Sequence, residues 1–214
     1  MLQRHLTALD NLIAGFDHAL RIVAARAPAA QRPSPAAGVD QQPLSAADRQ
    51  HAAGLMRVNH SGEVCAQALY QGQAATAKLA DVRTQMERAA SEEIDHLAWC
   101  EQRLKALDSR PSLLNPLWYA ASFALGAGAG LISDKLSLGF VAATEQQVSD
   151  HLQQHLAALP EQDLASRAVV AQMLSDEQQH ARDALAAGGW QFPAPLRRAM
   201  SAVAAVMTTS SYRL

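Results

Sequence analysis

Residues 92–96, Glu-Glu-Ile-Asp-His, and residues 176–180, Asp-Glu-Gln-Gln-His, decide the fold of this chain because each contains the motif Glu-x-x-His. In an α-helix, residues i and i+3 lie about 60° apart around the axis, so the carboxylate and imidazole of one motif can bind one cation. Each motif follows a further glutamate, Glu63 or Glu145, by 30 and 32 positions respectively. The sequence therefore predicts two similar helix pairs, each with three metal-binding side chains.

Four helices that contribute Glu, Glu-x-x-His, Glu and Glu-x-x-His match the ligand set of the ferritin-like di-iron and di-manganese carboxylate bundles. A single Glu-x-x-His is common on a solvated helix face, but two copies with matched upstream glutamates are much less expected by chance. Four buried carboxylates carry a formal charge that two divalent cations would cancel. The predicted metal ligands are Glu63, Glu93, His96, Glu145, Glu177 and His180.

The residue before each motif is also acidic: Glu92 before Glu93 and Asp176 before Glu177. A one-residue step rotates a side chain by about 100° around a helix, toward the neighbouring helix. We expect these carboxylates to orient the imidazoles crosswise, Asp176 on His96 and Glu92 on the other histidine, because metal-binding histidines usually donate their second N–H. The competing interpretation is a solvent-facing Glu92.

Composition favours a helical protein that does not bind nucleic acid. Of the 214 residues, 49% are hydrophobic and 5% aromatic, and the small side chain of alanine suits closely packed helices. The net charge is −2, and no dense Lys/Arg cluster appears. Asp10 and Asp17 interrupt the apolar region that a signal peptide would need, so we expect the protein to stay on the cytoplasmic side.

The chain divides into three predicted parts. Residues 1–26 carry apolar side chains at alternating steps of four and three, which predicts an amphipathic helix that packs on the bundle or lies on a membrane. Residues 27–44 are rich in Pro, Ala and Gln, which predicts a mobile linker. Residues 45–214 form the predicted ferritin-like domain.

Helix boundaries follow from caps and prolines. Ser45 with Asp48 resembles a capping box that opens the first bundle helix. We predict bundle helices over about 45–79, 82–107, 135–158 and 161–187, and a short last helix after Pro195. The predicted fold is therefore an all-α four-helix bundle with accessory helices at both ends.

Residues 112–133 join the second and third bundle helices and contain no charged side chain. Their length is close to the roughly 20 apolar residues that cross a bilayer. A crossing would put Glu93 and Glu177 on opposite sides of the membrane and prevent a shared metal site. We therefore predict a long crossover that either lies along a membrane surface or is buried in the protein.

A ligand set of carboxylates with one histidine per metal suits iron or manganese better than zinc or copper. Such a pair of irons can bind O2 and supply two electrons to it. Three other classes remain open at this point: an iron-storage or ferroxidase bundle, a dimanganese peroxide-handling enzyme, and a metal-free structural bundle.

The sequence contains Arg-Val-Asn-His-Ser-Gly-Glu at 57–63, Glu-x-x-His at 93–96, Ser-Asp at 133–134 with Ser-Leu-Gly-Phe at 137–140, and Asp-Glu-x-x-His at 176–180. Together these motifs resemble the demethoxyubiquinone hydroxylases of ubiquinone biosynthesis. The resemblance covers about residues 45–188, and the Asn-His-x-Gly-Glu string is its most specific part. It implies a di-iron monooxygenase, with two Fe ions held by the six residues above and no further catalytic side chain.

The resemblance also implies a substrate and a location. The substrate would be a polyprenyl methoxy-methyl-benzoquinol (demethoxyubiquinol), which is hydroxylated on its ring with O2. Its isoprenoid tail stays in the bilayer, so we expect a peripheral enzyme on the cytoplasmic face of the cell membrane. No dinucleotide fingerprint is present, so electrons would come from an external reductant, a donor protein or the quinol itself. An oligomer or a biosynthetic complex is compatible with this reading.

Overall fold

The ordered elements of the protein are helices. The computed structural model describes residues 17, 19–22, 29–40 and 42–214. Within these residues the long helices are α2 (Ala46–Thr76), α3 (Ala80–Ala106), α4 (Asn115–Ile132), α5 (Asp134–Ala158), α6 (Leu164–Ala186) and α7 (Ala194–Arg213). No strand occurs in the described part of the chain, and the predicted all-α class is confirmed.

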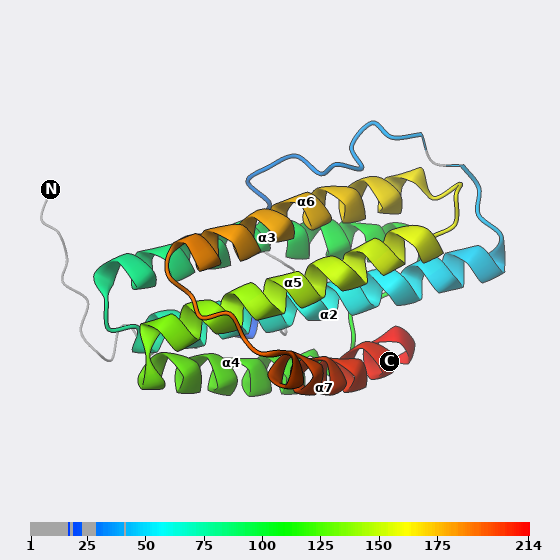
Figure 1. The fold of residues 1–214 in the computed structure, drawn as a ribbon. Coiled ribbons are helices and arrows are strands. Elements are labelled where there is room, and N and C mark those ends of the chain that lie inside the picture. The colour runs from blue at the N-terminus through cyan, green and yellow to red at the C-terminus, as the bar shows by residue number, and fades with distance from the viewer. Residues whose placement is uncertain (1–16, 18, 23–28, 41) are drawn as a thin grey trace, which may run out of the picture.

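Two helix hairpins form the centre of the molecule. α2 packs on α3 and α5 packs on α6, while contacts of α3 with α6 and of α2 with α5 join the two hairpins into a four-helix bundle (Figure 1). The largest core cluster draws on all four helices and includes Met56, Trp99, Leu152 and Met173, each at most 1% exposed. The bundle therefore places residues of both sequence halves around one interior.

Helix ends agree with the predicted caps in one case and differ in another. Ser45 caps α2, because its Oγ accepts the backbone N–H of Asp48 at 3.1 Å, as the capping box predicts. α6 begins at Leu164 and not at the predicted Glu161. The reason is Asp163, whose Oδ1 accepts the N–H of Ser166 at 3.0 Å and makes Asp163 the cap.

The predicted crossover is the helix α4, which packs closely on α2. A Cβ at Gly126 would lie 2.2 Å from the carbonyl oxygen of Leu69, and a Cβ at Gly72 would lie 2.3 Å from that of Phe123. Neither position has space for a side chain. These two glycines therefore let the backbones of α2 and α4 approach each other closely. α2 is the helix that carries Glu63.

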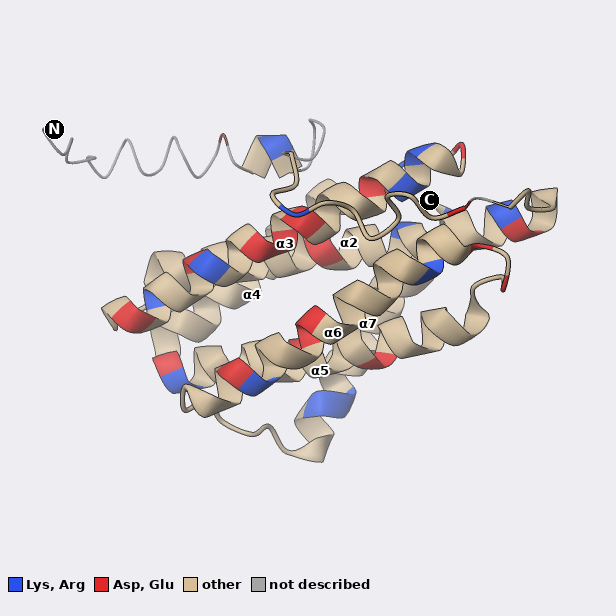
Figure 2. Ribbon diagram, turned by 90° about the horizontal axis from the view of Figure 1, so that it is seen from above, with Lys and Arg blue, Asp and Glu red and all other residues tan. Residues whose placement is uncertain are grey.

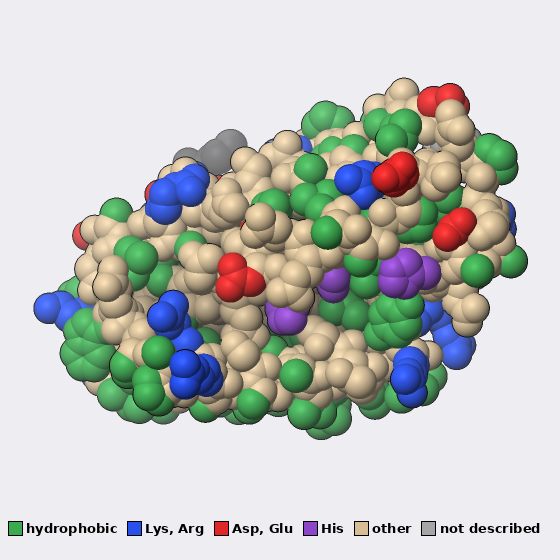
Figure 3. Space-filling model, turned by 45° about the vertical axis from the view of Figure 1, so that its right-hand side comes forward, with side chains coloured by type: hydrophobic (Ala, Val, Ile, Leu, Met, Phe, Trp, Pro, Cys, Tyr) green, Lys and Arg blue, Asp and Glu red, His purple; other side chains and the backbone are tan. Residues whose placement is uncertain are grey.

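The outer face of α4 is apolar and exposed. α4 contains no charged residue, so it is tan along its whole length in Figure 2. Figure 3 shows hydrophobic side chains along the lower edge of the molecule, the side on which α4 and α7 lie in Figure 1. The exposed apolar residues of this α4–α7 face are Leu113, Leu117, Phe123, Leu125, Leu131, Ile132, Leu196, Val203 and Val206. Among the described helices, none combines the length and hydropathy required for a transmembrane span.

Residues outside the bundle differ from the expectation in two places. The last helix, α7, has 20 residues and is not short; it packs on α2. Residues 29–40 and 42–44, within the predicted linker, run along the bundle, where Ala30, Ala36 and Leu44 pack against its core.

The predicted N-terminal helix over 1–26 lies mostly outside the described residues. Residues 17 and 19–22 are helical, and Ile22 is 4% exposed against Val64, Leu97 and Tyr119. Leu20, which belongs to the predicted apolar stripe, is 46% exposed. The division into three parts at residues 26 and 44 stays a prediction.

Candidate metal centre

Six side chains predicted from the sequence converge in the middle of the bundle. α2 carries Glu63, α3 carries Glu93 and His96, α5 carries Glu145, and α6 carries Glu177 and His180. One ligand atom from each of Glu63, Glu93, His96 and Glu177 lies within 4.8 Å of the others. All of the carboxylates are at most 2% exposed.

Glu93 and Glu177 each span the two imidazoles, with one oxygen toward each. The Nδ1 atom of His96 lies 3.0 Å from Glu93 Oε2 and 3.0 Å from Glu177 Oε1. The Nδ1 atom of His180 lies 3.2 Å from Glu93 Oε1 and 3.3 Å from Glu177 Oε2. Residues from both halves of the chain therefore share these carboxylates.

The two upstream glutamates complete the group. Glu63 Oε2 lies 3.6 Å from the Nδ1 atom of His96. Glu145 accepts a hydrogen bond from the hydroxyl of Tyr70, a fully buried side chain of α2, and interacts with Glu177. The structure thus brings all six predicted residues together.

The buried carboxylates of the centre shift the pKa values of the side chains around them. Burial, followed by the charge of Glu177, raises the pKa of Glu145 well above its usual range. Burial also raises the pKa of Glu63. Burial alone would lower the pKa of His180, but hydrogen bonds and charges of Glu177 and Glu93 raise it to about 12. Four buried carboxylates are therefore stable only with protons or cations among them.

Carboxylate oxygens at this centre fit the requirement of a bound cation. Glu145 Oε2 is buried and has no hydrogen-bond partner among the described residues, whereas Glu93 Oε1 and Glu177 Oε1 each lie beside an imidazole Nδ1 atom, at 3.2 and 3.0 Å. An unsatisfied buried carboxylate oxygen is costly unless a cation or proton meets it. The imidazole Nδ1 atoms face the same interior, so the group offers both nitrogen and oxygen ligands to a metal. Oxygen-rich ligation with one nitrogen per metal suits iron or manganese.

The outer nitrogen of each histidine meets a carboxylate from the opposite half of the chain. His96 Nε2 lies 2.9 Å from Asp176 Oδ2, and His180 Nε2 lies 2.8 Å from Glu92 Oε2. A carboxylate can only accept, so each Nε2–H donates outward and Nδ1 faces the centre, where a bound cation could take the place of its proton. These are the crosswise contacts expected from the sequence; their role at a metal centre stays a prediction.

Asp176 is held as an anion. Burial opposes its ionisation, but hydrogen bonds from His96, Arg32 and Gln172 together lower the pKa of Asp176 to about 2. Gln172 donates to Asp176 Oδ1 at 2.9 Å from one turn earlier in α6. The carboxylate that orients His96 therefore stays charged at neutral pH.

Arg32 is the residue at this centre that sequence reasoning missed. It lies in the predicted linker, yet its guanidinium contacts Asp95 and Asp176 at 2.7 and 2.8 Å. Its partners are 63 and 144 positions away, so no local pattern points to them. The only available signal was an arginine directly before two prolines, in Gln-Arg-Pro-Ser-Pro at 31–35.

Two further residues flank the ligands without binding the centre. His60 shares the helix face of Glu63 but is 3% exposed and contacts Asn115, whose Nδ2 lies 3.2 Å from His60 Nδ1. Trp99 is 1% exposed, and its ring centroid lies 5.5 Å from that of His96. They pack around the ligands.

Comparison with known proteins identifies the family. The sequence model of the family described as ubiquinone biosynthesis protein COQ7 matches residues 50–211, which is most of the chain. The chain belongs to the COQ7 family. Curated relatives support the same conclusion over nearly the full length. A protein of Azotobacter vinelandii is 59% identical over 212 residues, covering 99% of both chains.

Two further curated relatives have comparable identity to this chain. A protein of Marinomonas is 59% identical, covering 98% of this chain and 100% of its own. A protein of Pseudomonas aeruginosa is 57% identical, covering 99% of this chain and 98% of its own. All three relatives carry the name 3-demethoxyubiquinol 3-hydroxylase. The COQ7-family chain is therefore similar to enzymes along its whole length.

A solved structure shows the fold independently. A dodecameric thioferritin, the bacterioferritin-related protein from Bacteroides fragilis, matches with a TM-score of 0.53 at 20% identity. The match covers 64% of this chain and 83% of that chain. The ferritin-like fold predicted from the ligand spacing is thus confirmed.

Proposed function

We propose that the chain is an O2-dependent di-iron monooxygenase that hydroxylates the ring of demethoxyubiquinol in ubiquinone biosynthesis. The observation that carries the proposal is the sharing of Glu93 and Glu177 between two histidines from opposite halves of the chain. The name of the near full-length relatives supplies the substrate. The side chains of the bundle are the proposed metal ligands, and the name of the relatives indicates the hydroxylation.

The six residues would hold two iron ions. The residues that would hold them are Glu63, Glu93, His96, Glu145, Glu177 and His180, with Glu93 and Glu177 each turning one oxygen toward each imidazole. Bound iron supplies the two electrons and the open coordination positions that O2 activation requires. The chain provides oriented imidazoles, through Asp176 and Glu92, and an interior from which water is excluded.

The α4–α7 face gives the proposal a place for the rest of the substrate. An isoprenoid tail is insoluble in water, so the enzyme has to meet it at a lipid surface. Exposed contiguous apolar side chains mark an interaction site on a soluble fold. We propose that this face lies on the cytoplasmic side of the cell membrane, peripherally, while the quinol head group enters the bundle. A reductant from outside the chain, or the quinol itself, would supply electrons, and a larger complex is compatible with this arrangement.

The test is the quinone content of a strain that lacks the gene. Quinones are extracted and identified by mass spectrometry. The proposal predicts that the demethoxy intermediate accumulates and that the wild-type gene restores ubiquinone, whereas Glu177→Ala does not. Normal ubiquinone in the deletion strain that has no second hydroxylase would contradict the proposal.

Metal and activity measurements separate the alternatives. A soluble ferritin-like ferroxidase would oxidise Fe(II) without a quinol, and a dimanganese peroxide-handling enzyme would bind manganese and consume peroxide. The proposal predicts instead that purified chain loaded with iron hydroxylates a short-tailed demethoxyubiquinol with O2 and a reductant. Glu177→Gln, which keeps the shape of the side chain but loses its charge, should abolish this turnover.

A further inference from the structure

The segment before α2 crosses the outside of the metal centre at Arg32. Its guanidinium joins two helices, because Nε lies 2.7 Å from Asp95 Oδ2 on α3 and Nη1 lies 2.8 Å from Asp176 Oδ2 on α6. Nη2 lies 3.4 Å from the Nε2 atom of His96. Arg32 therefore covers the outer edge of this imidazole together with the carboxylate that orients it.

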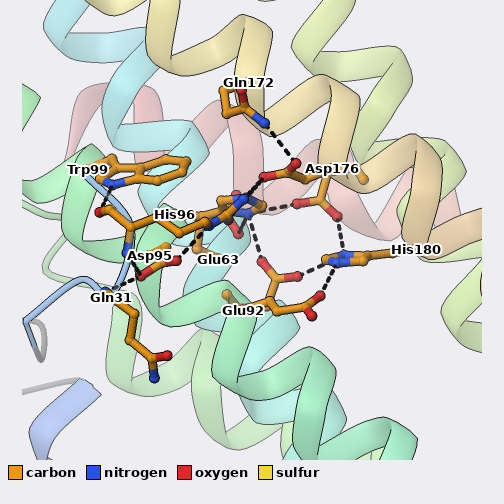
Figure 4. Close-up of polar contacts among 12 residues, drawn as sticks. Gln31, Glu63, Glu92, Asp95, His96, Trp99, Gln172, Asp176 and His180 are labelled. Atoms are coloured by element: carbon orange, nitrogen blue, oxygen red, sulfur yellow. Dashed lines mark hydrogen bonds and ion pairs between the residues drawn. The ribbon is translucent and has the colours of Figure 1, made fainter. Parts of the chain in front are cut away.

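The backbone around Arg32 is fixed by further contacts. The N–H of Gln31 donates to Asp95 Oδ1 at 2.6 Å, and the indole N–H of Trp99 donates to the carbonyl of Arg32 at 3.4 Å (Figure 4). The guanidinium carbon lies 4.8 Å from the centroid of the Trp99 ring, within the range of a cation–π interaction. Pro33 disfavours helical backbone at the preceding residue. The segment is thus held against α3 at Asp95 and Trp99.

Among the described residues, the other half of the centre has no comparable cover. Glu92, the partner of His180, is 36% exposed as a side chain, whereas Asp176 is 17% exposed. Glu92 takes an ion pair from Arg88 one turn earlier on its own helix, at 2.9 Å, and the Arg88 side chain is 78% exposed. Accordingly the His96 side chain is 0% exposed and that of His180 is 11% exposed. The two similar half-sites differ in their outer layer.

We propose that Arg32 is a positioning residue that latches the His96 half of the centre, so that a metal ion held there is released more slowly than one held at the His180 half. This inference rests on the proposed metal-binding function. For His96 to leave a metal it has to rotate, and rotation requires Asp176 to move. Asp176 is bound by Arg32, which is bound in turn by Asp95 and Trp99. At the other half, the ion pair that the described residues give Glu92 is the solvent-exposed one with Arg88, on the same helix.

The chain itself offers a matched control. Arg32 and Arg88 each bind the carboxylate that meets an outer imidazole nitrogen, but Arg32 spans two helices and Arg88 stays on one. A general loss of charge near the centre would affect both variants equally. A latch affects the Arg32 variant selectively.

The experiment follows iron release from the full-length protein. Wild type, Arg32→Ala, Arg32→Lys and Arg88→Ala are loaded anaerobically with Fe(II) and mixed with excess of a coloured Fe(II) chelator. Wild type should release iron in a fast and a slow phase. Arg32→Ala should accelerate the slow phase by about 10-fold, the lower end of the effect of residues that support metal ligands. Arg32→Lys should recover part of the delay, and Arg88→Ala should leave the slow phase within about twofold of wild type.

Two results would overturn the latch. One is release of both ions from wild type in a single phase; the other is a slow phase that stays unchanged in folded Arg32→Ala or accelerates equally in Arg88→Ala. If Arg32→Ala fails to fold by circular dichroism, Asp95→Asn removes the same anchor and carries the same expectation. A wild-type chain that binds no iron would overturn the proposed function as well, whereas a loaded wild type with unaffected Arg32 and Asp95 variants overturns the latch alone.

Discussion

Replacing Gly126 with alanine tests the close packing of α4 on the helix that carries Glu63. The added Cβ would lie 2.2 Å from the carbonyl oxygen of Leu69, and a contact of this kind requires at least about 3 Å. α4 and α2 would have to separate by roughly 1 Å, because the obstructing atom belongs to the backbone of α2. Overpacking of this size costs about 1–3 kcal/mol.

Gly128→Ala is the matched control for this prediction. It lies on the same helix, but no atom lies within 4 Å of its added Cβ. Both substitutions gain up to about 1 kcal/mol of helix propensity, so the difference between them isolates the packing effect. We predict that Gly128→Ala is neutral or stabilising and that Gly126→Ala unfolds with a free energy lower than that of Gly128→Ala by about 2 kcal/mol or more.

The assay is urea unfolding of both variants, followed by circular dichroism at matched protein concentration. Comparable slopes against urea would show that the midpoints report stability. Equal free energies of unfolding for the two variants would refute the close approach of α4 and α2 at Gly126.

Further substitutions test the site and the surface. Asp176→Asn should weaken iron affinity by about 10- to 100-fold in a chelator competition, because His96 loses the carboxylate that orients it; unchanged affinity would contradict this role. Burial lowers the pKa of His60 from 6.5 to about 4, so the unfolded chain binds a proton that the folded chain excludes between these pH values. Stability contributed by neutral His60 is thus complete above pH 6.5 and lost as the pH falls to 4, and we expect the stability advantage of wild type over His60→Gln to shrink by about 3 kcal/mol across this window; a constant difference in urea unfolding would refute it. Leu131→Glu, on the α4–α7 face where Leu131 is 65% exposed, should reduce co-sedimentation with vesicles of bacterial lipid, whereas Leu164→Glu, at an exposed position of α6, should not; equal binding by both variants would remove this face as the membrane contact.

The predicted metal ligands could be recognised from the sequence because they recur at helical spacing. Glu93 with His96, and Glu177 with His180, each lie one turn apart, so helix geometry alone puts them on one face. The upstream glutamates Glu63 and Glu145, at nearly equal distances from the two motifs, then indicate a ferritin-like four-helix bundle. The contacts of Asp176 with His96 and of Glu92 with His180 followed from the same helix geometry. A side chain one residue before a ligand glutamate is turned toward the neighbouring helix.

Contacts between distant segments carried no such signal. Arg32 reaches Asp95 and Asp176 across the bundle, and nothing in the composition of a Pro- and Ala-rich segment indicates a docked guanidinium. The start of α6 at Leu164 depends instead on a local contact, because Asp163 Oδ1 accepts the N–H of Ser166. The same oxygen also accepts a hydrogen bond from Arg103 of α3 at 3.0 Å.

Glycine spacing is an intermediate case. The alternation Gly126-x-Gly128 was visible in the sequence, but only the position of Leu69 shows which glycine is required. Gly128 has open space beside it and Gly126 does not. No close approach of helices was predicted from this pattern, and the structure shows that Gly126 makes one.

The most direct test of the central claim is the number and coupling of irons bound by each chain. Full-length protein is titrated anaerobically with ⁵⁷Fe(II), exposed to O2, and measured by metal analysis and Mössbauer spectroscopy. The account predicts two irons per chain that become a spin-coupled pair, and loss of that pair in Glu93→Ala and Glu177→Ala. A single uncoupled iron per chain, or wild-type iron content and coupling in both variants, would contradict the convergence of the two halves on one pair of metal ions.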